Sequence, residues 1–287
     1  MTLTPEAKRL ILLALREDIG SGDITTALVV DPLKKAEALI YAKGAGILAG
    51  INMAEAVFKT QDRKIGFKPL LKDGQKLKRG EKVAQIHGSA SSILIAERTA
   101  LNFLQHLSGI ATLTNRFVMK TCHTRAVICD TRKTTPGFRI MEKYAVQVGG
   151  GKNHRLGLYD QILIKDNHIR MAGSVSDAIR RTLARNKRGL PLEVETSNLS
   201  QVKEALACGA DWIMLDNFSL AEMKKPISLI RAFSKSTKKK MTIEVSGQVS
   251  LENVLSIAKT GPDLISIGQL THSAPALDFS LEIVKEQ

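Results

Sequence analysis

The chain has 287 residues, 44% of them hydrophobic, which is enough to bury the core of one large domain or two smaller ones. Its 21 glycines and 8 prolines are near average usage, which excludes a disordered or fibrous protein. The net charge of +14 favours an anionic partner: nucleic acid, anionic lipid, or a phosphorylated or carboxylated metabolite. Aromatic residues make up only 4% and do not interleave with basic ones, so nucleic acid is the weaker interpretation.

The cysteines and the apolar stretches indicate a protein of a reducing compartment. The cysteines form no C-x-x-C pair, and a zinc site of Cys122, His123 and Cys129 would have a spacing unlike the common patterns. The apolar stretch 10–15 is too short for a secretory signal and runs into charged residues. The longest uncharged run, 99–115, is rich in polar residues, so no membrane span is expected and the predicted location is cytoplasmic.

The first part of the chain mixes helical and strand patterns. Residues 5–17 are amphipathic with proline in the first turn, which predicts a helix. Residues 34–49 predict strands with a glycine turn, and 71–88 predict a hairpin-like run with Asp-Gly and Arg-Gly turns. That run resembles a lipoyl or biotinyl carrier, but a carrier needs a modifiable lysine at a hairpin tip of a much smaller domain, so we interpret it as structural. Residues 92–120 predict a long helix in which Gly109 marks a potential break.

From residue 126 onward, short apolar runs alternate with helical patterns. Their spacing of roughly 20 to 30 residues is typical of a repeated strand-then-helix unit. One or two further strands are expected near residues 145–148 and in the poorly patterned gap. This pattern predicts a (β/α) barrel, with an open doubly wound sheet as the alternative. The runs are "AVICDTRK" (126–133), "ILIKDN" (162–167), "LEVET" (192–196), "IMLDN" (213–217), "IEVSG" (243–247) and "ISIGQ" (265–269).

Alternation along these runs separates an apolar face from a polar face. In "LEVE", Leu192 and Val194 share one face while Glu193 and Glu195 share the other. The apolar faces must meet the helices, so the polar residues point into the barrel at its carboxyl-end mouth, where such barrels carry active sites. Mutual pairing in a structural core is the alternative, but a structural barrel favours Val and Ile in these layers. The mouth residues are Lys165, Glu195, Asp216, Ser246 and Gly268.

Loops beyond the strands add cations to this mouth. Several cations with two or three carboxylates suit a multiply anionic ligand, because the guanidinium fork matches planar carboxylates and phosphates. Glu195 and Asp216 suit sugar hydroxyls or a magnesium ion that carries a phosphate. The small residues at Ser246-Gly247 and Gly268 predict a phosphate cradle of backbone N–H groups at the start of the following helices. The cations are Arg98, Arg132, Lys133, His154 and Arg155.

The glycine run in "VGGGKNHRLG" (148–157) superficially matches a nucleotide-binding loop. That loop requires Ser or Thr after the lysine, and here Asn153 follows Lys152. It also requires a glycine five positions before Gly151, where Val146 stands. The glycines therefore mark either an ordinary tight turn or space cleared for the His-Arg pair that follows.

Nine stretches, in order, are similar to the quinolinate phosphoribosyltransferases, also called nicotinate-nucleotide pyrophosphorylases (carboxylating). They run from about residue 17 to the C-terminus, and their order and spacing argue against chance similarity. They are "EDIGSGDITT", "AERTALNFLQHLSGIAT", "DTRKTTPGFR", "EKYAVQVGGGKNHRLGL", "ILIKDNHI", "LEVET", "IMLDN", "IEVSG" and "ISIGQLTHSAPALDFSLEI".

The resemblance implies an α/β fold in which an incomplete (β/α) TIM-like barrel follows an N-terminal α/β sandwich domain. The expected boundaries are 1–112 plus 271–287 for the sandwich, which the C-terminal tail completes, and 113–270 for the barrel. It implies a homodimer, or a higher oligomer, with active sites at the subunit boundary. Family members convert quinolinate and phosphoribosyl pyrophosphate to nicotinate mononucleotide, pyrophosphate and carbon dioxide with Mg²⁺, a step of de novo NAD biosynthesis.

The resemblance also implies roles for the mouth residues. Lys133 would meet the phosphosugar, and Glu195 and Asp216 would hold ribose hydroxyls or magnesium; with Lys165 these form the expected catalytic set. Lys152 would be incidental and the glycines a turn. The residues expected to bind the quinolinate carboxylates are Arg132, His154, Arg155, Lys165 and, from the neighbouring subunit, Arg98. The residues expected near the phosphosugar and its 5′-phosphate are Thr131, Ser246, Gly247, Gln248, Ile267, Gly268 and Gln269.

Two residues depart from the family pattern. Gln248 stands where a second glycine is usual, and Gln269 where alanine is usual. Both lie near the expected 5′-phosphate, so they leave its ligands open without affecting the expected reaction.

Three other functions compete. A molybdenum-linked paralogue shares the fold and the "TRK" segment, but "ILIKDNH" and "KNHR" favour the quinolinate enzyme. A Schiff-base aldolase would need an apolar or cationic setting that lowers the pKa of Lys165. A nucleic-acid binder would rest on the net charge alone, without a base-reading motif. Neither a nucleic-acid nor a membrane partner is expected.

Overall fold

The computed structural model describes residues 3–286, which form two compact units. The first comprises Met1–Asn115, Thr134–Gly150 and Gln269–Gln287, and the second Arg116–Lys133 and Gly151–Gly268. The resemblance implied that the N-terminal domain ends at residue 112 and resumes at residue 271. The compact units divide close to these points but group residues 134–150 with the first unit rather than with the barrel.

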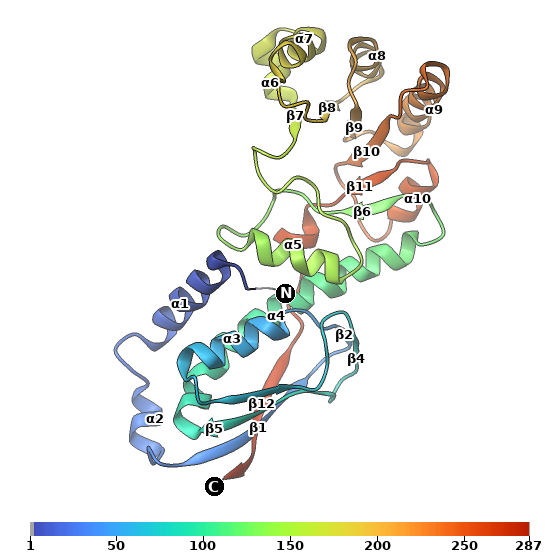
Figure 1. Cartoon of the computed structure of the whole chain (residues 1–287). Coiled ribbons are helices and arrows are strands. Elements are labelled where there is room, and N and C mark those ends of the chain that lie inside the picture. Colours follow the sequence, from blue (N-terminus) through green and yellow to red (C-terminus); the bar gives the residue numbers. More distant parts are fainter. Residues whose placement is uncertain (1–2, 287) are drawn as a thin grey trace. The chain divides into compact units, whose positions relative to one another are not determined.

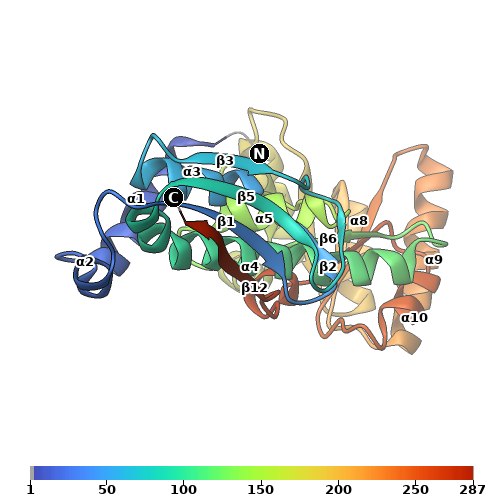
Figure 2. The same cartoon turned by 90° about the horizontal axis from the view of Figure 1, so that it is seen from below.

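The first unit contains a four-stranded antiparallel sheet in the order β12-β1-β5-β3. Alternate residues of β1, from Ala36 to Ala42, are buried, as the period of a half-buried strand requires. Strand β12 is the C-terminal tail, and it lies alongside β1, as the resemblance implied (Figure 2). The strands are β1 (Lys35–Ala42), β3 (Gly66–Pro69), β5 (Lys82–Ser89) and β12 (Phe279–Glu286).

The helices of this unit begin at clear sequence signals. The Oγ1 of Thr4 accepts the N–H of Ala7 and caps α1, which confirms the helix expected over residues 5–17. Strands expected near 145–148 are wrong: Met141 and Ala145 are buried one helical turn apart, and the segment forms α5. The helices are α1 (Pro5–Ile19), α2 (Ile24–Val29), α3 (Ile51–Gln61), α4 (Ala90–Thr121, entering the second unit at Arg116), α5 (Arg139–Val148) and α11 (Gln269–His272).

The hairpin expected over residues 71–88 does not form as one unit. Strand β4 (Lys76–Leu77) pairs with β2 (Gly46–Ile47), whereas β5 pairs with β1 and β3. Both predicted turns are present, with Gly74 and Gly80 at φ of 90° and 82°. Alternating apolar residues identify a strand but do not select its partner, which explains the difference.

Helix α4 continues through Gly109, where a break was considered. A Cβ at Gly109 would lie 2.2 Å from the carbonyl oxygen of Pro275 and 3.0 Å from the Cα of Ala276. The glycine therefore lets the backbone of the C-terminal tail pack directly against the helix. Its role is close approach rather than helix termination.

Replacing Gly109 with alanine is expected to destabilise the protein. Glycine-to-alanine changes inside a helix usually stabilise by roughly 0.5–1 kcal/mol, but here the overpacking against Pro275 and Ala276 should cost about 1–3 kcal/mol. Thermal unfolding of the variant and the parent protein would show a lower Tm for the variant. A higher Tm would contradict the close approach.

The second unit is built on a six-stranded parallel sheet in the order β6-β11-β10-β9-β8-β7 (Figure 1). From β7 to β11 each strand lies beside the next strand in the sequence, and β6 lies beside β11 in the sheet. The direction in which strands are added therefore never reverses. A doubly wound sheet reverses direction at a switch point, so this order identifies the barrel alternative. The strands are β6 (Val127–Cys129), β7 (Ile162–Ile164), β8 (Leu192–Thr196), β9 (Trp212–Asp216), β10 (Thr242–Ser246) and β11 (Leu264–Ser266).

Helices connect these strands in the predicted strand-then-helix alternation. Ser174, Asn198 and Ser219 cap three of them, each accepting a backbone N–H three residues on. The buried faces of the helices carry apolar residues such as Ile179 and Val202. The helices are α6 (Asp166–Ala172), α7 (Val175–Arg185), α8 (Leu199–Cys208), α9 (Leu220–Thr237) and α10 (Val254–Lys259).

The barrel is incomplete between β6 and β7. No ladder joins these two strands among residues 3–286, although Lys152 forms an isolated parallel bridge with Cys129 beside β6. The chain that connects β6 to β7 leaves the second unit at Lys133 and returns to it at Gly151. Over the described part of the chain, every helix is too short or too polar to cross a membrane.

Candidate active site

Charged side chains stand at the carboxyl ends of three neighbouring strands of the second unit. Lys165 directly follows β7, Glu195 lies in β8 and Asp216 ends β9. Because the strands are parallel, these ends meet at one edge of the sheet. The Nζ of Lys165 lies 2.8 Å from Oε2 of Glu195, with the lysine side chain 45% exposed and the glutamate 12%. The predicted mouth therefore contains an ion pair whose lysine side is open to solvent.

Asp216 shares this mouth with further charges. Burial and then the negative charge of Glu195 raise the pKa of Asp216, while the charges of Lys165 and Lys133 lower it. The Nδ2 of Asn217 donates to Oδ2 of Asp216 over 2.7 Å. Two carboxylates with two lysines beside them can accept hydrogen bonds from sugar hydroxyls or contact a hard cation.

A histidine fixes the start of α6 beside this ion pair. The backbone N–H of Lys165 donates to Nδ1 of His168 over 2.9 Å, as part of the cap of α6. This bond sets the turn from which the Lys165 side chain projects. His168 was not among the predicted site residues, although its place shortly after a strand end is typical of a capping residue.

Two arginines form the second part of the site. Burial and then the positive charge of Arg132 lower the pKa of Arg155, while the charges of Glu193 and Asp160 raise it. Arg155 is only 8% exposed, and its guanidinium donates to the carbonyl oxygen of Gln161 over 3.3 Å. The positive charges of the two arginines oppose one another, so their arrangement suits a carboxylate or phosphate ligand.

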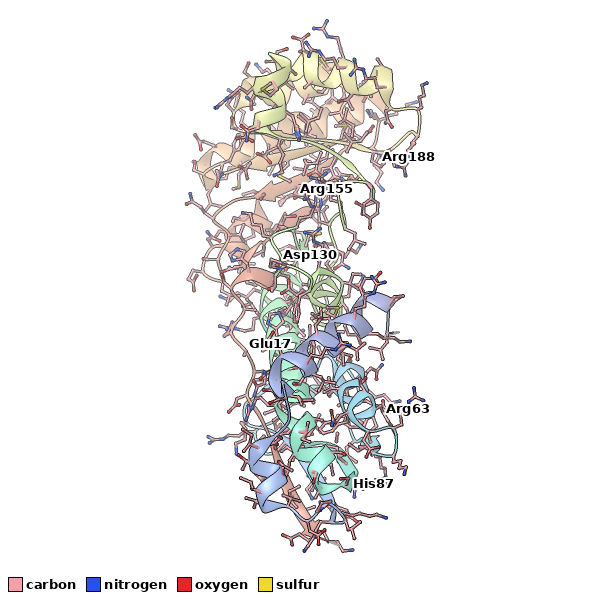
Figure 3. All side chains as sticks on the ribbon, turned by 90° about the vertical axis from the view of Figure 1, so that its left-hand side faces the viewer. Glu17, Arg63, His87, Asp130, Arg155 and Arg188 are labelled. Atoms are coloured by element: carbon pink, nitrogen blue, oxygen red, sulfur yellow. The ribbon has the colours of Figure 1, made fainter. Side chains whose placement is uncertain are left out.

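The loop that follows the glycine run brings Arg155 to this position. Lys152 exchanges two backbone hydrogen bonds with β6 and the residue after it, of 2.9 and 3.1 Å. The buried Asp130 then accepts the backbone N–H of His154 over 2.8 Å; Asp130 and Arg155 are labelled in Figure 3. Gly150 has a φ of 92°, in agreement with the expected turn. Lys152 was expected to be incidental, but its backbone anchors this loop to β6.

The side chain of His154 lies inside the barrel. It is 5% exposed, and its Nε2 lies 3.1 Å from Oε2 of Glu193 and 3.4 Å from Oε2 of Glu244. Its Nδ1 accepts the backbone N–H of Arg155 over 2.8 Å, and its ring centroid lies 5.3 Å from that of Trp212. Both ring nitrogens are thus directed to groups of the protein itself, and the expected contact between His154 and a diacid stays a prediction.

Glu193 and Glu244 are fully buried beside this histidine. Burial and then the charge of Glu244 raise the pKa of Glu193 to about 7, while the contact with His154 lowers it. Burial lowers the pKa of His154, while its contacts with the two carboxylates raise it. Because Nδ1 accepts the N–H of Arg155, the ring in this arrangement is the neutral tautomer with its proton on Nε2, facing the carboxylates. Glu193 was expected on the inward face of its strand, and the same alternation in "IEVS" puts Glu244 there, but neither residue was expected to belong to the site.

The turn after β10 has a backbone that only certain residues adopt easily. Gly247 has a φ of 96°, and a Cβ there would lie 2.2 Å from Oδ1 of Asn217. Gln248 has a φ of 46°, a left-handed conformation that costs a non-glycine residue about 1–2 kcal/mol. The side chain of Asn253 donates to the carbonyl oxygen of Gln248 over 2.9 Å and helps to hold it there. The family's usual glycine would adopt this conformation without strain.

The expectation of a helix N-terminus directly after this turn is wrong. Helix α10 begins only at Val254, eight residues after Ser246. The intervening chain forms bends and a turn because Gly247 and Gln248 both adopt positive φ, which a right-handed helix excludes. Any phosphate bound here would meet the amides of the turn rather than those of a helix.

The remaining predicted residues divide between the two units. Thr131 accepts the N–H of Lys133 through its Oγ1 over 3.0 Å, and Ile267 donates its N–H to the carbonyl of Cys129 over 2.9 Å at the end of β11. Gly268 ends the second unit. Arg98 is exposed on α4 and Gln269 opens α11, and both belong to the first unit. The structure thus groups the strand-end residues within one unit and assigns Arg98 and Gln269 to the other.

Potential metal-ligand atoms gather away from the cysteines. Within residues 3–286, the cluster whose ligand atoms lie within 4.8 Å of one another consists of His154, Glu193 and Glu244. Cys122 is exposed and Cys129 is buried, and neither belongs to this cluster. The zinc site considered for the segment 122–129 therefore does not form.

Comparison with known proteins places this geometry in a family. The sequence models of the N-terminal and C-terminal domains of quinolinate phosphoribosyl transferase match residues 23–108 and 110–282. The probable nicotinate-nucleotide pyrophosphorylase [carboxylating] of Bacillus subtilis is 42% identical over 97% of this chain and 93% of its own length. The protein of the same name from Methanocaldococcus jannaschii is 43% identical, with 98% of each chain covered.

Solved structures agree with this assignment. NadC from Streptococcus pyogenes superimposes with a TM-score of 0.92 at 42% identity, over 100% of this chain and 99% of that one. The nicotinate-nucleotide pyrophosphorylase from Francisella tularensis gives a TM-score of 0.90 at 40% identity, over 98% and 97% of the two chains. Both domain matches, the sequence identities and the fold agree: this chain belongs to the quinolinate phosphoribosyl transferase family.

Proposed function

We propose that this protein transfers the phosphoribosyl group of phosphoribosyl pyrophosphate to quinolinate with loss of carbon dioxide, giving nicotinate mononucleotide and pyrophosphate. The observation that carries this proposal is the mouth itself, where an arginine pair and a lysine–carboxylate cluster occupy one unit of a family member. The names of the relatives point to the same reaction, and none of those compared supports the molybdenum-linked alternative.

Quinolinate would bind through the cations of the mouth. It carries two adjacent carboxylates on a pyridine ring, and Arg132 and Arg155 offer two forks whose mutual repulsion such a ligand would relieve. Lys165 would supply a third positive charge at the strand ends. Each charge-assisted hydrogen bond contributes about 1.5–3 kcal/mol, so three of them suffice to hold a diacid that water solvates well.

The phosphosugar would bind at the carboxylate side. Glu195 and Asp216 would accept the ribose hydroxyls, and Lys133 would contact the phosphates. The 5′-phosphate would meet the amides of the turn at Ser246, Gly247 and Gln248. Thr131, Ile267, Gly268 and Gln269 complete the proposed phosphosugar contacts.

Magnesium fits the donor set of this half of the site. Carboxylate oxygens are ligands that Mg²⁺ prefers, and a cation would relieve the repulsion by which Glu195 raises the pKa of Asp216. When bound with the substrate, Mg²⁺ would supply charge neutralisation at the pyrophosphate. The Nζ of Lys165, 2.8 Å from Glu195, competes for the same oxygen, which favours contact through substrate or water rather than a cage of protein ligands.

The side chains would act mainly by positioning and by stabilising charge. Lys133 would stabilise the departing pyrophosphate, and the two carboxylates would stabilise the oxocarbenium-like ribose. Arg132, Arg155 and Lys165 would hold the pyridine nitrogen against C1, where the new N–C bond forms. The C–CO2 bond then breaks with its electron pair left on the ring carbon, where the adjacent positively charged nitrogen stabilises it, and that carbon takes up a proton from solvent.

A second copy of the chain would complete the site. Arg98 is exposed on α4, and we propose that it enters the mouth of the neighbouring subunit of a homodimer or higher oligomer. This places a further cation near the quinolinate carboxylates without requiring Arg98 to reach the mouth of its own chain. Neither nucleic acid nor membrane is a proposed partner, and a cytoplasmic location is part of the proposal.

A coupled assay tests the reaction directly. Purified protein would be mixed with quinolinate, phosphoribosyl pyrophosphate and Mg²⁺, and nicotinate mononucleotide measured, with nicotinate as the control substrate. Product from quinolinate but not from nicotinate, lost on chelation with EDTA and restored by Mg²⁺, is the expected result. Failure to form product from quinolinate would refute the proposal.

Replacing Gly247 with alanine is expected to raise the KM for phosphoribosyl pyrophosphate about tenfold or more. The added Cβ would meet Asn217 at 2.2 Å, and alanine tolerates the φ of 96° poorly, so the turn must shift. The KM for quinolinate should stay within about threefold, because the arginine pair lies outside this turn. Equal rises in both constants would argue against a phosphate site at Gly247.

A further inference from the structure

A buried carboxylate, Glu193, lies near Arg155 on the inward face of β8, the face that also carries Glu195. Glu193 in β8 has no exposed surface, and its Oε2 lies 3.1 Å from Nε2 of His154 and 2.9 Å from the Nε2 of Gln161, which donates to it. A carboxylate buried to this degree is tolerated only when it is paired or protonated, so these contacts are tightly constrained. Glu193 thereby joins a strand of the barrel to the loop on its open side.

The same two partners of Glu193 hold Arg155. The main-chain carbonyl oxygen of Gln161 accepts a hydrogen bond from the guanidinium of Arg155 over 3.3 Å. The Nδ1 of His154 accepts the backbone N–H of Arg155 over 2.8 Å. Arg155 is thus fixed at its backbone and at the tip of its side chain by residues that both lead back to Glu193. The other buried carboxylate, Glu244, lies 3.4 Å from His154. Among the interactions described, the hydrogen bond of the Gln161 side chain goes to Glu193 and not to Glu244.

We propose that Glu193, through Gln161 and His154, is a positioning residue that sets the Arg155 guanidinium for a carboxylate of the substrate. This inference rests on the proposed function, since it assigns Arg155 to quinolinate. It gives His154 a role in orienting the arginine. It also explains why a barrel interior that favours aliphatic residues contains a buried carboxylate at this level.

A positioning role predicts a selective defect. If Arg155 loses its alignment, quinolinate should bind less well while phosphoribosyl pyrophosphate, which binds at the other side of the mouth, should be little affected. Displacement of a positioned group by about 1 Å can lower catalysis by two orders of magnitude, so a tenfold effect on one substrate is a modest expectation. A defect of packing alone would change stability and both substrates together.

The experiment compares Glu193→Ala, Glu193→Gln and Gln161→Ala with the parent protein. Glu193→Ala is expected to raise the KM for quinolinate at least about tenfold, with the KM for phosphoribosyl pyrophosphate within about threefold. Glu193→Gln keeps the shape and an oxygen acceptor, and should recover most of the quinolinate affinity. Gln161→Ala, at a partly exposed position, should reproduce the selective defect even if Glu193→Ala does not fold.

Two controls separate positioning from general damage. Glu244→Gln changes the other buried carboxylate and should alter stability more than the ratio of the two KM values. Tyr159→Ala changes an exposed side chain of the same loop, 64% exposed, and should match the parent protein. Calorimetric binding of phthalate, a dicarboxylate without the pyridine nitrogen, would report the diacid site without turnover and should weaken in Glu193→Ala and Gln161→Ala.

Three outcomes would overturn the inference. Equal rises in both KM values for Glu193→Ala and Gln161→Ala would indicate a purely structural role. Unchanged quinolinate and phthalate affinity in folded variants would remove the link to Arg155. Stoichiometric metal in the parent protein that is lost in Glu193→Ala would instead assign the cluster of His154, Glu193 and Glu244 to a cation. Failure of the proposed function itself would appear differently, as a parent protein that forms no nicotinate mononucleotide.

Discussion

Alanine at Arg155 or at Lys133 is expected to lower turnover at least ~100-fold, the loss typical when one preorganised donor is removed. Burial and the charge of Arg132 both lower the pKa of Arg155, which means that they destabilise its charged form. A bound anionic substrate would compensate for this, so we expect its interaction with Arg155 to be strong. Lys133 lies on the carboxylate side, where its charge lowers the pKa of Asp216. The two residues thus serve different halves of one reaction.

The two variants should differ in their substrate dependence. Arg155→Ala should lower turnover and raise the KM for quinolinate. Lys133→Ala should lower turnover and raise the KM for phosphoribosyl pyrophosphate, with little effect on the KM for quinolinate. Steady-state kinetics with each substrate varied in turn measures this difference. A loss below about threefold in either variant would count against its assignment. Arg185→Ala is a matched control, because Arg185 is exposed in the same unit at the carboxyl end of α7, away from the strand ends that form the mouth.

The strand positions and the direction of their side chains were accessible from the sequence. Six apolar runs at regular spacing predicted the six strands of the sheet, and alternation placed Lys165 and Glu195 on the inward side, where they form an ion pair. Both properties are local, since period and polarity are encoded in each run. The common mouth then follows from parallel strand direction alone.

Features that depend on distant partners were less accessible. The strands expected near residues 145–148 are part of α5, and β4 pairs with β2 rather than within the predicted hairpin. Gly109 was considered as a helix break, yet its function is the close approach of residues 275–276, which the local sequence does not reveal. In each case the local pattern was compatible with two structures, and a contact far along the chain decided between them.

The direction of His154 illustrates the same limit within the site. Alternation gives the orientation of a side chain only on a strand, and His154 lies in a loop. Its ring turns inward because Asp130 holds its backbone N–H and two buried carboxylates lie near its Nε2. Glu193 and Glu244 could be placed inside the barrel from the sequence, but their convergence on one histidine required the three-dimensional arrangement.

Mixing two inactive variants is expected to restore activity if Arg98 serves the neighbouring subunit. Arg98→Ala and Lys133→Ala should each be nearly inactive alone. In a dimer of one of each, the site that keeps Lys133 receives the intact Arg98 of its partner and works, while the other site lacks both. Random exchange makes half of the dimers mixed, each with one working site, so activity should recover to about a quarter of the parent value.

Complementation of this kind distinguishes the shared site from a site within one chain. If Arg98 served its own chain, every site in the mixed dimers would lack one of the two residues and activity would stay near zero. A mixture of Lys133→Ala with Arg155→Ala is the control, because both residues belong to the same unit of one chain and their exchange leaves no complete site. Co-expression followed by separation of the mixed dimers makes the measurement independent of the exchange rate. Recovery in the first mixture alone would therefore assign Arg98 to the neighbouring site. Recovery in neither mixture would show that Arg98 does not serve the neighbouring site.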